Sequence, residues 1–172
     1  MNKTLNTNAI AFIALCNEYC QAIENARESE RDEFIANILR LLPRLYISAT
    51  DLNTEVPDDE EPYLESSIDE DYYESVRRSV ESIFGPDDVY LEVFEEDMKY
   101  SDTPISASIA EGLSDIFQDL YNFIEMVKDA PDPIIAVALV AVKENFESYW
   151  GHTLCNVLRA INHVRYTPSS EY

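Results

Sequence analysis

Glycine is scarce in this chain, which has three glycines among its 172 residues: Gly85, Gly112 and Gly151. Loops that cradle phosphate groups place several glycines close together, because the backbone must approach the ligand closely. The three glycines here lie far apart in the sequence. We therefore exclude a phosphate-binding P-loop and a dinucleotide-binding fingerprint.

Basic side chains are also few, since 12 lysines and arginines stand against 34 aspartates and glutamates. The formal net charge is -22 at pH 7. Proteins that bind nucleic acid or an anionic membrane surface use Lys and Arg to contact phosphate groups. We therefore expect neither nucleic acid nor a membrane among the partners of this protein.

Cysteines and long apolar runs are too few for a secreted or membrane-spanning protein. Cys16, Cys20 and Cys155 do not make the disulfide framework of a small secreted domain, so we predict reduced, buried thiols. The apolar run at 9–15 lacks the charge and the cleavage site of a signal peptide. The run at 134–142 has about half the length of a membrane span. These features predict a cytoplasmic protein.

Helical periodicity fills most of the sequence. Apolar residues recur every three or four positions in the segments 8–27, 32–52, 69–84, 105–128 and 132–166. Pro43 removes a backbone donor, which predicts a kink in the second segment or a break into two helices, and Gly151 predicts a bend in the last. Short connections between long helices favour antiparallel neighbours. We predict an all-α fold, an antiparallel (up-and-down) bundle of four main helices plus minor helices, in a single domain of residues 1–172.

Residues 89–94 alternate weakly between apolar and polar side chains, as a strand does. An isolated strand has no partner with which to form a sheet. A helical turn or an extended arm therefore explains this segment at least as well as a strand does.

Acidic residues are concentrated in an insert at about 51–103. Residues 51–102 contain 19 acidic and three basic side chains, so they carry -16 of the net charge of -22. Within the insert, residues 55–67 contain two prolines and a run of four acidic residues, which predicts an exposed loop. The insert serves either as a solubilising surface or as a docking face for a basic protein.

Glu111, Asp115 and Asp119 form the strongest candidate for a chemical site. Their spacing of four places all three carboxylates on one face of the helix predicted at 105–128. Stacked like charges destabilise a helix, and a bound divalent cation would compensate for them. A solvated acidic face explains the same spacing without any ligand.

A second candidate group surrounds the single tryptophan. Trp150 and His152 flank Gly151, where a bend in the helix would let them line a groove with Tyr149. A core aromatic cluster explains the same residues without a ligand, and Tyr46 has the same two interpretations. The binding candidates are Asp115, Asp119, Tyr46, Trp150 and His152.

The common catalytic motifs are absent or weak. The chain has two histidines, and no Ser or Cys lies in the strand–turn–helix elbow of a hydrolase. The Glu-x-x-His pair of di-iron helical bundles does not occur. We therefore predict no metal and no cofactor, and we favour a binding protein over an enzyme.

Four segments carry a resemblance to a known family: FIALCNEYCQAI (12–23), LLPRLYISATDL (41–52), SDIFQDLY (114–121) and FESYWGHTLCNVL (146–158). With the acidic insert between them, the chain resembles a family of bacterial proteins catalogued as a domain of unknown function. The resemblance extends over most of the chain. It implies an all-helical cytoplasmic protein and supplies no activity, ligand or catalytic residue.

The favoured interpretation is an acidic, non-enzymatic helical module that binds a basic partner protein through its insert. The alternative is a metal-dependent enzyme that uses Glu111, Asp115 and Asp119 in a groove of the bundle, together with His152. The two interpretations differ in whether these side chains converge on one cavity.

Overall fold

The structure, a computed structural model, describes residues 5–55, 60–92, 99–100 and 103–167. The α-helices are α1 (Thr7–Glu24), α2 (Arg31–Thr50), α3 (Glu70–Phe84), α4 (Ile109–Val127), α5 (Asp132–Asn145) and α6 (Gly151–Tyr166). The shorter elements are the 3-10 turns Ala26–Glu28 (η1) and Gly85–Asp88 (η2), the π-helical turn Phe146–Trp150 (η4), and the strands β1 (Val89–Leu91) and β2 (Ser106–Ser108).

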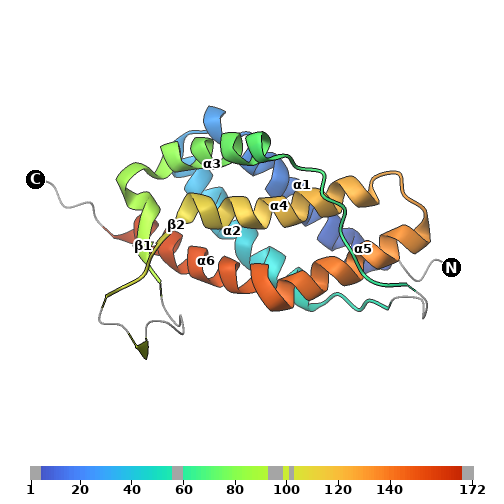
Figure 1. Cartoon of the computed structure of the whole chain (residues 1–172). Coiled ribbons are helices and arrows are strands. Elements are labelled where there is room, and N and C mark those ends of the chain that lie inside the picture. Colours follow the sequence, from blue (N-terminus) through green and yellow to red (C-terminus); the bar gives the residue numbers. More distant parts are fainter. Residues whose placement is uncertain (1–4, 56–59, 93–98, 101–102, 168–172) are drawn as a thin grey trace, which may run out of the picture.

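Helices α1 to α4 run in alternating directions, and α5, the π-helical turn and α6 follow one another as one long rod that runs opposite to α4 (Figure 1). The two strands lie at one end of the bundle. The fold is therefore all-α apart from this small sheet, which confirms the fold class predicted from the sequence. In the described part of the chain, no helix is both long enough and apolar enough to cross a membrane.

Helix α4 lies at the centre of the packing. It contacts α1, α3, α5 and α6, while α2 contacts α1 and α6. The fully buried apolar side chains belong to one hydrophobic cluster, and the largest include Phe12, Tyr19, Leu45, Phe84, Phe117 and Trp150. Burying a side chain of this size stabilises a fold by about 1.5–3 kcal/mol.

The buried residue Asp88 joins the small sheet to the start of α4. Its carboxylate accepts hydrogen bonds from Ser108 Oγ at 2.6 Å and from the backbone N–H of Ala110 at 2.7 Å. Ser108 Oγ also caps α4 by accepting a hydrogen bond from the backbone N–H of Glu111 at 3.1 Å. These contacts fix the position of β2 relative to α4.

The sheet corrects two predictions made from the sequence. Val89–Leu91 form a strand, rather than a helical turn or an arm, because Ser106–Ser108 pair with them in antiparallel register. The helix predicted to begin at 105 consequently begins at Ile109. Ile105, Ala107 and Ile109 alternate with Ser106 and Ser108, but this short run leads directly into the apolar stripe of α4, so helical periodicity hid the strand. The last two residues of the strand-like segment at 89–94 lie outside the described residues.

Helix α2 contains Pro43 within one helix, so the predicted break into two helices is wrong. Leu41, Leu42 and Leu45 are fully buried around the proline. Their burial offsets the backbone hydrogen bond that proline removes.

The three cysteines are free thiols in two different environments. Cys16 and Cys20 are buried, as predicted, and burial raises the pKa of both thiols. Cys155 is exposed, which corrects the prediction that all three are buried. It lies on the surface of α6, where apolar sequence neighbours face other directions around the helix.

Candidate functional site

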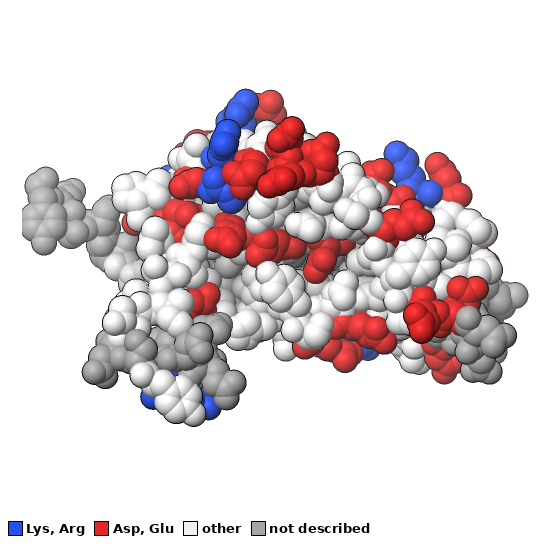
Figure 2. Space-filling model, in the orientation of Figure 1, with Lys and Arg blue, Asp and Glu red and all other residues white. Residues whose placement is uncertain are grey.

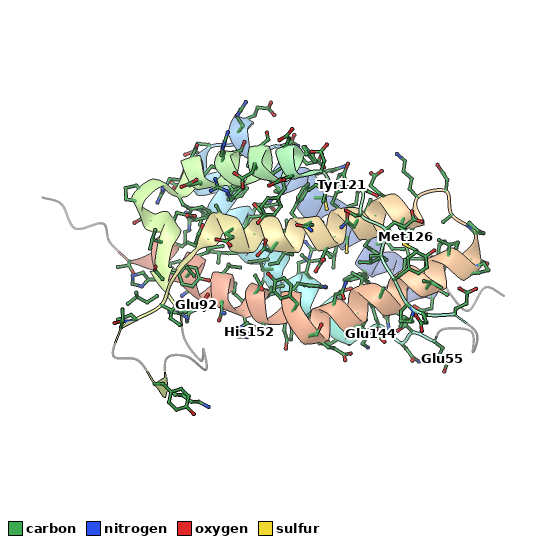
Figure 3. All side chains as sticks on the ribbon, viewed as in Figure 1. Glu55, Glu92, Tyr121, Met126, Glu144 and His152 are labelled. Atoms are coloured by element: carbon green, nitrogen blue, oxygen red, sulfur yellow. The ribbon has the colours of Figure 1, made fainter. Side chains whose placement is uncertain are left out.

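A polar pocket lies at the end of the bundle that carries the β1–β2 sheet. Its volume is about 410 Å³, and its lining comes from the sheet, α4, the π-helical turn and α6. Among the described residues that line it, the charged ones are Glu92, Glu111 and Asp115, and none is Lys or Arg. Figure 3 labels Glu92, beyond β1, and His152, on the adjacent part of α6. We term this hollow the acidic pocket.

Gly112 lines the acidic pocket where α4 approaches α6. A Cβ atom at this position would lie 2.4 Å from Cγ1 of Val157. Val157 is buried and β-branched, so its side chain has little freedom to move away. Glycine at 112 therefore permits the short distance between the two helices.

The π-helical turn at Phe146–Trp150 replaces the simple bend that the sequence predicts at Gly151. A Cβ atom at Gly151 would lie 2.6 Å from the carbonyl oxygen of Phe146, so the turn requires glycine. Turns of this kind are frequent at functional sites. Tyr149 and His152 lie on either side of Gly151 and both line the acidic pocket.

Two tyrosines hold the carboxylate of Asp115. The hydroxyl of Tyr73 donates to Oδ1 at 2.5 Å, and the hydroxyl of Tyr149 donates to Oδ2 at 2.9 Å. Burial, followed by the hydrogen bond to Asp115, raises the pKa of Tyr149 to about 12, and the same causes raise the pKa of Tyr73. Both hydroxyls therefore stay protonated near neutral pH and fix the orientation of Asp115.

The opposite wall of the acidic pocket is organised around Asn156. Its side-chain Nδ2 donates to Oε2 of Glu92 at 3.1 Å and lies 3.2 Å from Nε2 of His152. The hydroxyl of Tyr90 donates to Oε1 of Glu92 at 3.4 Å. A carboxylate from the acidic insert is thereby held against α6.

Asp119 does not line the acidic pocket, unlike Glu111 and Asp115. It lies one turn further along α4 and is half-buried. Burial, and then the charge of Asp115, raises the pKa of Asp119 to about 6. The predicted carboxylate row is therefore divided, with two members at the pocket and one beside it.

The aromatic candidates lie away from the acidic pocket. Trp150 is fully buried in the core, where its indole N–H donates to the carbonyl oxygen of Val142 at 3.1 Å. Tyr46 lies on α2, 39% exposed, with its ring edge-on to Phe146 at 5.0 Å between centroids. Of the five binding candidates, the structure brings together Asp115 and His152.

The described residues contain no group of three or more His, Cys, Asp or Glu side chains arranged to hold a metal ion. Glu111, Asp115 and His152 share the pocket, but Asp115 already accepts two tyrosine hydrogen bonds. The arrangement instead presents carboxylate oxygens and tyrosine rings to one cavity. Such a cavity is suited to an ammonium or guanidinium group.

Four residues of the site are not among the binding candidates predicted from the sequence: Tyr73, Tyr90, Glu92 and Asn156. Tyr90 and Glu92 are two residues apart, so a strand at 89–92 places both on one face. That alternation was the available signal, although it lacked a partner strand. Tyr73 and Asn156 reach the site only through the packing of α3 and α6 against α4.

Comparison with known proteins places the chain in a family. The family model described as Domain of unknown function (DUF5063) matches residues 3–167. The chain belongs to this family. This confirms the resemblance found in the sequence.

The crystal structure of protein BF1032 from Bacteroides fragilis is similar, with a TM-score of 0.81 and 30% sequence identity. The similarity covers 97% of this chain and 98% of that chain. No curated protein gives a significant match. The comparisons therefore support the fold and add no activity or ligand.

Proposed function

We propose that this protein is a non-enzymatic module that binds a basic partner protein, with the acidic pocket receiving a cationic side chain of that partner. The observation that carries this proposal is the lining of the pocket. It combines the carboxylates of Glu92, Glu111 and Asp115, and no Lys or Arg is among the described lining residues. An isolated cation entering the pocket would be attracted by all three carboxylates.

The aromatic lining of the pocket favours a guanidinium or ammonium group as the bound cation. Tyr149 lines the cavity, and an aromatic ring attracts a cation placed over its face. Tyr90 also lines it, but Arg159 of the same chain already lies 5.9 Å from its ring centroid. The guanidinium group of arginine also stacks on aromatic rings while donating to carboxylates. An arginine side chain therefore matches the chemistry of this lining most fully.

The charge around the pocket supports a protein partner rather than an isolated small cation. Figure 2 shows Asp and Glu side chains spread over α3 and α4 on the visible face. A broad field of one sign increases the rate at which an oppositely charged protein associates. The acidic surface would attract the partner, and the pocket would select one of its side chains.

The experiment measures binding of a fluorescent arginine–glycine nonapeptide to the whole protein by fluorescence anisotropy. Glu111→Gln removes one exposed pocket carboxylate. We expect it to weaken binding about fivefold, because losing one ion pair costs about 1 kcal/mol. The matched control is Glu144→Gln, an exposed residue of α5 that does not line the pocket.

Equal weakening by the two variants would contradict the proposal, because it would indicate binding to the general negative charge. A titration with Mg²⁺ or Mn²⁺ tests the alternative of a metal-dependent enzyme. Stoichiometric binding of either ion that Asp115→Asn abolishes would replace the binding-module proposal with that alternative.

A further inference from the structure

A second hollow, between α2 and α6, has a different chemistry from the acidic pocket. Its volume is about 530 Å³. Leu39 and Pro43 of α2, with Leu158 and Tyr166 of α6, supply most of its lining. Ligand sites commonly combine an apolar lining of this kind with a few polar groups. We term this hollow the α2–α6 groove.

The charged group at the α2–α6 groove is positive, although the chain as a whole is strongly acidic. Arg159 lines the groove, and no Asp or Glu is among the described lining residues. The exposed side chain of Asn162 lies one turn further along α6 and also lines the groove. Arg159 and the side-chain amide of Asn162 therefore bring N–H donors to a largely apolar lining.

Arg159 has donors available for an anion. Its Nη2 donates one hydrogen bond to the carbonyl oxygen of Leu91 at 2.7 Å, and its Cζ lies 5.9 Å from the ring centroid of Tyr90. The ion pairs among the described residues do not include Arg159. A guanidinium group has five N–H donors in a planar fork, so the remaining donors suit a carboxylate.

We propose that the α2–α6 groove binds a free amphiphilic carboxylate, a small molecule with an acyl chain and one carboxylate group. The acyl chain of the ligand packs against Leu39, Pro43 and Leu158. Its carboxylate group accepts hydrogen bonds from Arg159 and Asn162. Each methylene group removed from water increases the binding constant roughly fourfold. Charge complementarity selects the carboxylate, since an amine of the same length would face the guanidinium group.

Cys155 provides a direct readout because its thiol also lines the groove. It is the exposed cysteine of the chain, whereas Cys16 and Cys20 are buried in the core. Iodoacetamide should therefore alkylate Cys155 alone in the native protein. A bound acyl chain would cover the thiol and slow this reaction.

The experiment follows alkylation of Cys155 in the whole protein by mass spectrometry, with decanoate as the probe. We expect saturating decanoate to slow the reaction at least fivefold and decylamine to leave it unchanged. Alkylation of Cys16 or Cys20 would reveal unfolding by the detergent-like probe, so their protection serves as an internal control.

Two variants test the carboxylate contact. Asn162→Asp places a negative charge in the groove at an exposed position, and Arg159→Gln removes the positive charge. We expect both to abolish protection by decanoate, while Arg27→Gln, an exposed arginine of η1, leaves it intact.

Equal protection by decanoate and decylamine would overturn the proposal, as would undiminished protection in Asn162→Asp. Protection that grows with protein concentration in the absence of decanoate would assign the groove to a second copy of the chain. That result would also overturn the proposal. None of these outcomes depends on peptide binding at the acidic pocket.

Discussion

The two hollows lie on neighbouring faces of the same helix and differ in charge and polarity. Along α6, His152 and Asn156 face the acidic pocket, while Cys155 and Asn162 face the α2–α6 groove. Residues four or seven apart lie on one face of a helix, and each of these two pairs has such a spacing, so one helix can serve two sites. The two hollows differ in charge and polarity because the sheet and α4 lie on one side of α6, whereas α2 lies on the other.

The acidic insert contributes to that difference, together with Glu111 and Asp115 of α4. On one side of α6, the strand β1 adds Tyr90 and Glu92 to the pocket. On the other side, α2 contributes Leu39 and Pro43. Arg159 spans the two, because it lines the groove and donates to the backbone of β1. The insert therefore contributes polar residues to the pocket, while Val76, Val80 and Phe84 of its helix α3 belong to the core.

We expect the largest effect from a substitution in the π-helical turn, which precedes α6 and its two hollows. Gly151→Ala would place a Cβ atom 2.6 Å from the Phe146 carbonyl oxygen, and a backbone atom cannot move aside easily. We expect the free energy of unfolding to fall by about 3 kcal/mol, measured by urea denaturation. Ser148→Ala, at an exposed position in the same turn, should change it by less than about 0.5 kcal/mol. Equal stabilities of the two variants would show that the turn does not require glycine.

A second variant should separate the two hollows. Asp88→Ala removes the buried acceptor of Ser108 Oγ and of the Ala110 N–H, and so loosens the sheet from α4. We expect a loss of about 2 kcal/mol in the free energy of unfolding, because buried donors remain without partners. Binding of the arginine–glycine peptide should weaken, while protection of Cys155 by decanoate should persist.

The control for this variant is its neighbour, Asp87→Ala. Asp87 is exposed and pairs with Arg31 at 2.8 Å, and an exposed ion pair contributes less than about 1 kcal/mol. Loss of decanoate protection in Asp88→Ala, but not in Asp87→Ala, would show that the two hollows depend on one another.

The helical part of this fold was predictable because its signal is local. The apolar stripe of α4, which includes Leu113, Phe117 and Leu120, marks its buried face within the segment itself. The sheet was not predictable, because pairing of Leu91 with Ser106 joins residues across the insert. Ile105, Ala107 and Ile109 do alternate with Ser106 and Ser108, but so short a run merges with the apolar stripe of α4 and does not indicate a partner strand.

The candidate site was predictable only in the part that lies on helices. Asp115 and His152 stood out because helical spacing related them to other polar or aromatic residues in their own segments. Glu92 and Tyr90 required the register of the sheet, and Tyr73 required the packing of α3 against α4. Helical periodicity also assigned Asp119 to the same face as Asp115. In the structure, Asp119 is partly buried one turn further along α4 and does not line the pocket.

We expect the smallest effect from a substitution of Asp119. Its sign distinguishes a solvated row of carboxylates from a cation site formed by the same carboxylates. Burial and the neighbouring Asp115 raise the pKa of Asp119 to about 6 in the folded protein. The folded state therefore keeps a proton that the unfolded chain releases at lower pH. Ionising Asp119 in the folded state therefore lowers the free energy of unfolding. This loss is absent below the pKa that Asp119 has in the unfolded chain, and it is complete once the pH exceeds about 6.

Asp119→Asn removes this penalty, so it should raise the free energy of unfolding by about 1 kcal/mol at pH 7.5. This is below the ceiling of about 3 kcal/mol given by two pKa units, because the side chain is only half-buried. The gain should shrink as the pH falls from 6 toward 4, as urea denaturation at several pH values would measure. A cation held by Glu111, Asp115 and Asp119 would reverse the sign: the variant would then be less stable at pH 7.5. It would also lose any stabilisation that Mg²⁺ gives to the original protein, since an ion stabilises only the state that binds it.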